Sequence, residues 1–216
     1  MLLGIDAGGP HRVRSVLVAA HLITSTCDPW SSLGTGTFSL MDSLDDPLAP
    51  WRALKAQRQA LPLEDQALFI LLCVESILSL RPVHDAAGQE HLQAIWDVIG
   101  ADRSTLPTIA EALSQRPDID DRDELAALLF AVETLRGSPE AAEWGADRLV
   151  DDAYQRIPRD GRHTSYPSLA DDTAHIVIQD ELRWQRSVLG SLSAPDHVAR
   201  IPALRAQARA RGAASR

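Results

Sequence analysis

The sequence predicts an all-α protein, namely a single helical bundle of about seven to eight helices with an irregular N-terminal arm. Several stretches place apolar residues three and four positions apart, which is the spacing of an amphipathic helix. Strand and helix signals do not alternate along the chain, and there is no internal repeat, so an α/β fold or a solenoid is not indicated. A chain of 216 residues can bury a core without disulfides or metal, and we expect one domain.

Composition divides the chain into three regions. Residues 1–50 are expected to form an N-terminal arm, in which a short apolar element near residues 12–23, either strand or helix, precedes a Ser/Gly/Pro-rich linker. Residues 51–194 are expected to form the helical bundle. Residues 195–216 are expected to form a C-terminal basic helix and tail.

The first helices of the bundle follow from apolar periodicity. Residues 63–80 are apolar nearly all the way round, which predicts a helix buried on most sides at the centre of the bundle. Residues 85–99 carry Leu, Ile and Trp at helical spacing and predict the next helix. A shorter helix over residues 108–116 is expected to end before Pro117.

An acidic run precedes the apolar stretch LAALLFAVETL, which begins at Leu125. Carboxylates at a helix start are stabilised by the exposed backbone N–H groups and the helix dipole, and this explains the run adequately. A calcium-binding loop is the alternative. That loop requires Gly at its sixth position, where this chain has Asp123, so we disfavour it.

The remaining helices are bounded by turn signals. Gly137 suits the residue after a helix, Ser138 the N-cap and Pro139 the first helical position, so two helices are expected to meet there. After an irregular loop, a long helix is expected over residues 171–192, and a final helix over residues 195–211.

Composition also excludes several function classes. A net charge of −9 argues against non-specific binding to nucleic acid, which requires a basic surface. The longest apolar run, residues 67–74, is too short to cross a bilayer, and the first residues lack the pattern of a signal peptide. We therefore expect a cytoplasmic protein that does not bind membranes. Only the C-terminal region is basic, and we expect its arginines to be solvated: Arg200, Arg205, Arg209, Arg211 and Arg216.

The penultimate helix carries two polar residues on its apolar face. At about 100° per residue, Glu181 and Gln185 fall at the centre of an arc that also holds Ile178, Val188 and Leu192. Both side chains should therefore be buried, one above the other. A buried carboxylate is costly unless it is paired or protonated, so another group must compensate Glu181.

Glu75 poses the same problem in the central helix. One explanation is a structural network that links helices through Glu75, Glu181 and Gln185, with the indole N–H of Trp96 as a further donor. The other explanation is a polar pocket, which binds a small ligand or uses the glutamates as an acid/base pair. The structural network is preferred, because ion-pair networks also bury carboxylates in proteins without catalysis.

The order of four segments resembles the YjaG-like bacterial proteins, a helical family of unknown function. The segments are EDQALFILLCVES, LQAIWDVIG, FAVETLRGSPEAAEWGADRLVDDAY and VIQDELRWQRSVLGSL. The positions that carry the resemblance are Gln66, Phe69, Glu75, Trp96, Glu181 and Gln185. This chain departs from the pattern at Ser76, where the family has Arg, and residues 1–50 have no counterpart. The resemblance implies an all-α cytosolic protein with no established activity.

Metal and nucleophile signals are weak. Asp171 lies four residues before His175, and Asp85 precedes His91, which is similar to the carboxylate and histidine helices of di-iron proteins. No inward-facing Glu-x-x-His occurs, so we expect neither a metal nor another cofactor. The chain has no G-x-S-x-G motif, Cys27 and Cys73 form no C-x-x-C pair, and Cys73 in an apolar helix should be an inert thiol.

These observations favour a non-catalytic protein that binds a small molecule or a protein partner, with Gln66, Glu75, Trp96, Glu181 and Gln185 as the candidate polar site. The alternative is a small-metabolite enzyme, in which burial raises the pKa of one glutamate so that it acts as a general acid or base. A di-iron oxidase is a third, less favoured alternative. Homo-oligomerisation through the N-terminal arm is a further hypothesis.

Overall fold

The computed structural model describes residues 46–81, 85–99, 101–158 and 169–214. All regular structure in these ranges is helical, with no strand, which confirms the predicted all-α class. The elements, in chain order, are α2 (Ala49–Gln59), α3 (Leu63–Leu80), α4 (Ala86–Val98), the 3-10 turn η1 (Arg103–Thr105), α5 (Leu106–Ser114), α6 (Asp123–Leu135), α7 (Pro139–Gln155), α8 (Leu169–Ala174), α9 (Ile176–Leu192) and α10 (His197–Ala214).

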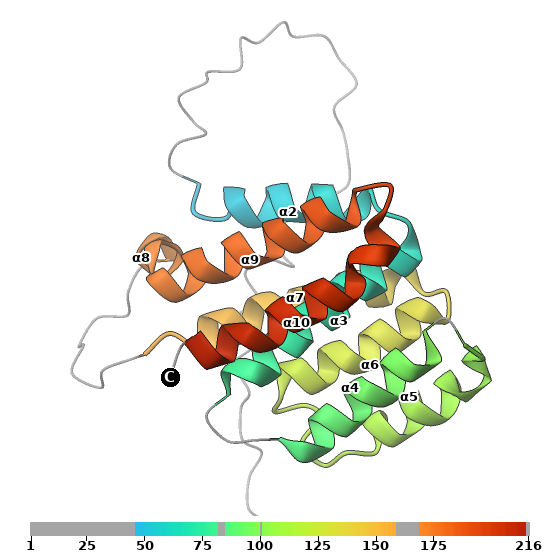
Figure 1. Cartoon of the computed structure of the whole chain (residues 1–216). Helices are drawn as coiled ribbons and strands as arrows, with labels where there is room; N and C mark the ends of the chain where they lie inside the picture. The colour runs from blue at the N-terminus through green and yellow to red at the C-terminus, as the bar shows by residue number, and fades with distance from the viewer. Residues whose placement is uncertain (1–45, 82–84, 100, 159–168, 215–216) are drawn as a thin grey trace, which may run out of the picture. The chain divides into compact units, whose positions relative to one another are not determined.

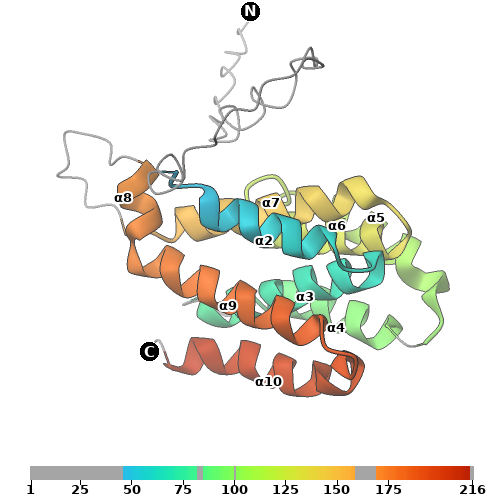
Figure 2. The ribbon, with the colours of Figure 1, turned by 90° about the horizontal axis from the view of Figure 1, so that it is seen from above.

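Helix α3 is the centre of the bundle, as its apolar sequence predicts. Every side chain from residue 67 to residue 78 is buried. Helix α3 contacts α10, α6, α7 and α9, and it lies between α10 on one side and α6 and α7 on the other (Figures 1 and 2). A helix with neighbours on most sides can be apolar around most of its circumference. This placement makes Glu75 on α3 an exception to explain.

The junction between α6 and α7 forms as its sequence indicates. Gly137 has φ 104, a left-handed conformation that a residue without Cβ adopts at little cost. The hydroxyl of Ser138 accepts a hydrogen bond from the backbone N–H of Ala141 at 3.2 Å, and Pro139 is the first residue of α7. The short turn makes α6 and α7 neighbours, and both contact α3.

Helix α2 is an element that the sequence analysis did not separate from the start of the bundle. Trp51 and Leu54 are buried, and the indole N–H of Trp51 donates to the hydroxyl of Tyr154 at 3.2 Å. Arg58 is also buried and donates to the backbone oxygen of Ala142 at 2.9 Å. Helix α2 is therefore joined to α7 through hydrogen bonds as well as apolar contacts.

The prediction of one helix over residues 171–192 is wrong. The chain forms α8 and α9, which are separated at His175, whose backbone is extended. The imidazole Nδ1 of His175 accepts a hydrogen bond from the backbone N–H of Val177 at 3.2 Å and so caps α9. Apolar periodicity does not reveal such a break, because a single capping residue hardly disturbs the spacing of its neighbours.

Helix α10 belongs to the bundle, although the sequence analysis treated residues 195–216 as a separate C-terminal helix and tail. Its contact with α3 runs through Leu204, Ala208 and Gly212, which are spaced four apart. A Cβ on Gly212 would lie 1.8 Å from the backbone oxygen of Ser79, so only glycine allows this approach. The hydroxyl of Ser79 also donates to the backbone oxygen of Ala208 at 2.9 Å.

Some expectations lie outside the described residues. These are the short element near residues 12–23, most of the linker before residue 46, and Cys27. Within the part of the chain that the structure covers, no helix has both the length and the apolar composition of a membrane span.

Candidate functional site

The polar pair on α9 is buried, as the helical wheel predicts. The side chain of Glu181 is 0% exposed and that of Gln185 is 3% exposed. The amide nitrogen of Gln185 donates to Oε1 of Glu181 at 3.1 Å, one helical turn away. A single amide does not compensate a buried charge, so the cations around Glu181 decide how the site behaves.

Two arginines from different helices neutralise Glu181. Nη2 of Arg156, next to the end of α7, donates to Oε2 of Glu181 at 2.9 Å. Nη1 of Arg211 on α10 lies 3.4 Å from the same oxygen and donates to the hydroxyl of Ser76 at 2.7 Å. Both carboxylate oxygens therefore accept hydrogen bonds. We call Glu181, Gln185, Arg156, Arg211 and Ser76 the Glu181 cluster.

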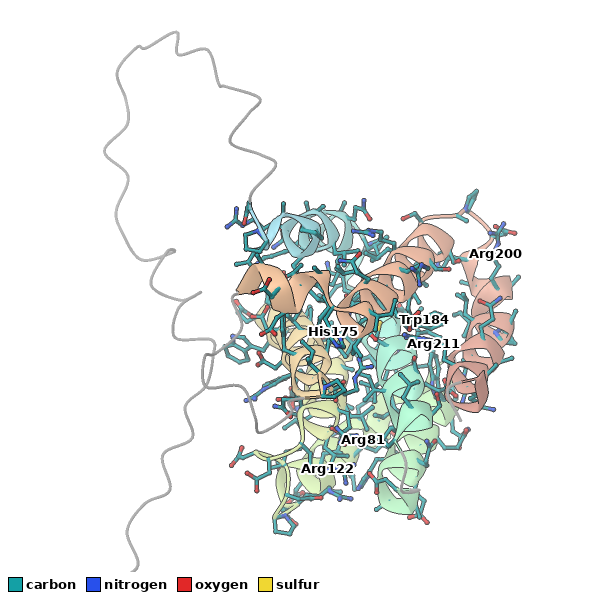
Figure 3. All side chains as sticks on the ribbon, turned by 90° about the vertical axis from the view of Figure 1, so that its left-hand side faces the viewer. Arg81, Arg122, His175, Trp184, Arg200 and Arg211 are labelled. Carbon is teal, nitrogen blue, oxygen red and sulfur yellow. The ribbon has the colours of Figure 1, made fainter. Side chains whose placement is uncertain are left out.

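A tryptophan borders the Glu181 cluster. The guanidinium carbon of Arg211 lies 5.2 Å from the ring centre of Trp184, within the range of a cation–π interaction. Figure 3 shows both side chains between α9 and α10. The contact covers the outer side of the cluster with an arginine that is 14% exposed.

Glu75 is the centre of a second cluster. Its side chain is buried, and its two oxygens accept hydrogen bonds from Nε of Arg205 at 3.0 Å and from Nε of Arg209 at 2.6 Å. Nη2 of Arg205 also donates to the side-chain oxygen of Gln93 at 3.2 Å. The guanidinium carbon of Arg205 lies 4.5 Å from the ring centre of Trp96. We call Glu75, Arg205, Arg209, Gln93 and Trp96 the Glu75 cluster.

The expectation that the indole N–H of Trp96 donates to a buried glutamate is wrong. The indole N–H of Trp96 is buried and has no hydrogen-bond partner among the described residues, so it does not donate to a glutamate. Trp96 instead presents its ring face to Arg205, which binds Glu75. The tryptophan thus contacts the cation of the cluster and not the anion.

Gln66 lies outside both clusters. Its amide donates to the backbone oxygen of Leu61 at 2.9 Å, in the turn before α3. It precedes Glu75 by nine residues, and at ~1.5 Å per residue this is roughly 13 Å along the helix axis. The structure therefore divides the other four candidate residues between two clusters. Gln66 instead stabilises the turn before α3.

The expectation that the C-terminal arginines are solvated is wrong for two of them. The side chains of Arg205 and Arg211 are only 19% and 14% exposed. Arg209 binds Glu75 but remains 57% exposed. Two buried carboxylates on neighbouring helices attract these guanidinium groups, whose long aliphatic portions reach inward from α10.

Three further side chains, the buried Asp152 and Glu124 and the partly exposed Arg81, extend the Glu181 cluster toward α6. Arg156 also donates to Asp152 at 2.7 Å, Asp152 accepts from Arg81 at 3.0 Å, and Arg81 donates to Glu124 at 2.6 Å. Glu124 also accepts from Nε of Arg122 at 2.8 Å. Figure 3 shows Arg81 and Arg122 at the end of this series of ion pairs that is far from Arg211. Alternating arginines and carboxylates thus connect α9, α7, α3 and α6.

The sequence analysis explained the acidic run before Leu125, which ends at Glu124, by the stability of carboxylates at a helix start, and for Glu124 this explanation is incomplete. Glu124 does lie in the first turn of α6, but it is 0% exposed and held by two arginines. A signal was present, because Glu124 precedes the apolar Leu128 by four residues and so shares its face. The same reasoning that identified Glu181 would have identified Glu124.

Burial dominates two ionisation equilibria near the clusters. Burial raises the pKa of Asp152 to about 6, against the opposing effect of Arg156 and Arg81. Burial also raises the pKa of the Cys73 thiol well above its ordinary value, and the nearby charge of Glu181 acts in the same direction. Cys73 is therefore buried and unreactive as a nucleophile, as its sequence context predicts.

Two of the side chains that suggested a di-iron site, Asp85 and His175, cap helices in the structure. Asp85 accepts a hydrogen bond from the backbone N–H of Gly88 at 3.0 Å and caps α4, and His175 caps α9. In the described ranges, no group of three or more His, Cys, Asp or Glu residues is arranged to hold a metal ion.

A surface hollow of about 290 Å³ lies outside both clusters. Its lining comes from the start of α2 and from α8 and α9, and includes Asp46, Pro47, Pro50, Thr173 and Gln179. None of the candidate residues lines it.

Comparison of the chain with protein-family models, with curated proteins and with solved structures finds no match.

Proposed function

We propose that this chain is a cytosolic, non-catalytic interaction protein, and that it binds a basic partner protein through a face formed by α6 and α7. Residue chemistry at the clusters supports a structural role for them: Glu75 and Glu181 are both buried and both held by arginines of the same chain. The buried free thiol of Cys73 suits a reducing compartment. The resemblance to the YjaG-like family belongs to this proposal and is supported by the burial of Glu75, Glu181 and Gln185.

The observation that carries the proposal is Trp144 on α7. This side chain is 53% exposed, and its ring packs edge-on against Phe130 of α6 at 5.6 Å between ring centres. Tryptophan is enriched at the energetic centres of protein interfaces, because it buries a large area with little loss of side-chain entropy. An aromatic pair that presents half a tryptophan to solvent is a candidate anchor.

Acidic residues determine the chemistry of the partner. Glu140, Asp147 and Asp151 share one face of α7 with Trp144, at spacings of four, three and four residues. Burial raises the pKa of Asp151 to about 6; the charges of Asp123 and Asp147 act in the same direction, and Arg148 opposes them. A partner with Lys or Arg side chains would relieve this repulsion and could place a cation over the Trp144 ring.

The alternative is an enzyme with Glu181 as general acid or base. It would require a substrate to reach a carboxylate that is 0% exposed and that accepts hydrogen bonds on both oxygens. No observation on the described residues favours it over the interaction protein.

Calorimetric titration of the full chain with a basic amphipathic helical peptide tests the proposal. The peptide carries Lys and Arg on one face, and a counterpart with Glu at those positions is the control ligand. We expect saturable binding of the basic peptide only, which weakens with added salt and falls at least about tenfold in Trp144→Ala. Ile176→Ala, which removes a side chain that is 69% exposed on α9, should leave binding unchanged.

Equal affinity of Trp144→Ala and the native protein for the basic peptide would refute the proposed face. Binding of the acidic counterpart with similar affinity would refute the proposed charge recognition. Glu181→Gln separates the enzyme alternative, because the interaction protein predicts a loss of folding stability with unchanged peptide affinity.

A further inference from the structure

Asp151 on α7 is a partly buried carboxylate that receives no hydrogen bond from, and forms no ion pair with, any described residue. Arg148, one turn earlier on α7, donates instead to Oδ1 of Asp123 at 2.9 Å. The amide of Gln155, one turn later, donates to Oδ2 of Asp123 at 2.6 Å. Asp123 is only 4% exposed, so this buried carboxylate of α6 takes both donors and leaves none for Asp151.

The charges that face Asp151 are mostly negative. They are the carboxylates of Asp123 on α6 and Asp147 on α7, and the guanidinium of Arg148, which is held by Asp123. The charged groups of α2 and α9 and at the end of α3 form pairs on the other sides of α7: Lys55 and Arg58 with Glu143, Arg81 with Asp152, and Glu181 with Arg156. No cation of these helices is therefore directed at Asp151 in the described part of the chain.

Asp151 and Trp144 lie on the same line along α7. They are seven residues apart, which places them about 20° apart around the helix and roughly 10 Å apart along its axis. Trp144 is 53% exposed, so this line offers an aromatic ring at one end and a carboxylate without a partner at the other. One helix of a bound partner can contact both positions, with an apolar side chain on Trp144 and a cation two turns away at Asp151.

The ionisation of Asp151 responds to such a cation. Burial raises the pKa of Asp151 to about 6, and the charges of Asp123 and Asp147 act in the same direction. The free protein therefore carries this carboxyl largely protonated at about pH 5 and largely ionised at about pH 7. An adjacent Lys or Arg side chain favours the ionised form, so the carboxyl gives up its proton to the solvent when the cation binds.

We propose that the basic partner places a Lys or Arg side chain against Asp151, and that acidification releases the partner by protonating this carboxylate. The inference rests on the proposed function, because it assigns the cation of the partner to a residue of the same α6–α7 face. Asp151 then makes binding depend on pH, whereas Trp144 contributes to binding at every pH.

Calorimetric titration of the full chain with the basic peptide at about pH 5, 6 and 7, at constant ionic strength, tests the inference. The peptide has blocked ends and only Lys and Arg as ionisable residues, so it does not titrate in this range. We expect affinity about tenfold weaker at the lowest pH than at the highest, because a group with a pKa of about 6 is then protonated in about ten of eleven molecules. Titrations near pH 6 in two buffers of different ionisation enthalpy should show release of about half a proton per complex.

Asp151→Asn reproduces the shape and charge of the protonated carboxyl. We expect this variant to bind about tenfold more weakly than the native protein near pH 7, and to change by no more than about twofold across the pH range. Glu140→Gln is the matched control, because it removes an exposed carboxylate from the same face of α7. It should lower the affinity and keep the native pH dependence. Circular dichroism at each pH verifies that every variant is folded.

The outcomes separate this inference from the proposed function. Native affinity that is equal across the pH range, but still reduced by Trp144→Ala, would overturn the inference and leave the proposed function intact. A pH dependence that persists in Asp151→Asn, or that disappears in Glu140→Gln, would overturn the assignment to Asp151. Absence of Trp144-dependent binding near pH 7 would refute the proposed face itself, and the inference with it.

Discussion

Replacing Arg156 by Met removes the cation that Asp152 and Glu181 share. Both carboxylates are almost fully buried, at 1% and 0% exposure. Removing one partner of a buried ion pair typically costs ~3–5 kcal/mol of folding free energy. Arg211 remains 3.4 Å from Glu181 and Arg81 remains 3.0 Å from Asp152, so we expect the lower end, about 3 kcal/mol.

A double-mutant cycle isolates the contact between Arg156 and Glu181. Glu181→Gln preserves shape and removes the charge, and we expect it to cost about 2 kcal/mol. In the double variant residue 181 is a neutral glutamine, so the loss of Arg156 leaves no uncompensated charge at this position. The combined cost should therefore be about 3 kcal/mol, which is about 2 kcal/mol less than the sum of the two single costs, and this difference is the coupling energy. Urea unfolding at neutral pH, followed by circular dichroism, measures each free energy of unfolding. Arg183→Met is the matched control, because this arginine of α9 is 70% exposed and should change stability by less than about 0.5 kcal/mol. Additive single costs would refute the direct ionic contact.

The remaining predictions concern a close helix contact and a crowded carboxylate. Gly212→Ala should destabilise the protein by about 2 kcal/mol in a thermal unfolding assay, because its Cβ would lie 1.8 Å from the backbone oxygen of Ser79. Gly190→Ala is the control: no atom lies within 4 Å of the added Cβ, so it should be neutral or stabilising by up to ~1 kcal/mol. Equal effects at the two glycines would contradict the close approach of α10 to α3. The pKa of Asp151 is raised from its usual 3.8 to about 6 in the folded protein, so the folded state binds this proton more tightly than the unfolded state does. The resulting stabilisation is fully present below pH 3.8 and is lost as the pH rises through about 6. Asp151→Asn should therefore gain roughly 1 kcal/mol relative to the native protein between about pH 4.5 and pH 7.5, after allowance for solvent screening, and a pH-independent difference would show that the pKa of Asp151 is not raised.

The sequence alone sufficed for the features that depend on local spacing. Residues 63–80 are apolar on nearly every side, and the structure places them at the centre of the bundle. Glu181 and Gln185 point inward because an α-helix fixes the direction of each side chain relative to its neighbours. The boundary at Ser138 and Pro139 likewise follows from capping chemistry that needs no distant partner.

The partners of the buried carboxylates could not be predicted in this way. Arg205 is 130 residues from Glu75, and Arg156 is 25 residues from Glu181, so their pairing depends on how the helices pack. The sequence predicted only that each buried carboxylate needs a group that compensates it. The break at His175 was missed for a related reason, since one imidazole hydrogen bond decides it and leaves the apolar spacing unchanged.

The contacts of Arg205 and Arg211 with buried carboxylates fix the position of α10 on α3. A Leu or Ala contact alone tolerates sliding along a neighbouring helix, because apolar contacts are not directional. A guanidinium group bound to Glu75 on one side and facing Trp96 on the other admits few positions, and Arg211 with Glu181 adds a second fixed point two turns from Leu204. The two points together specify both the depth and the register of α10 on α3. A helix from any source that presents this arginine spacing would be held in the same register, whereas one with lysines would lose the planar contacts on which that register depends.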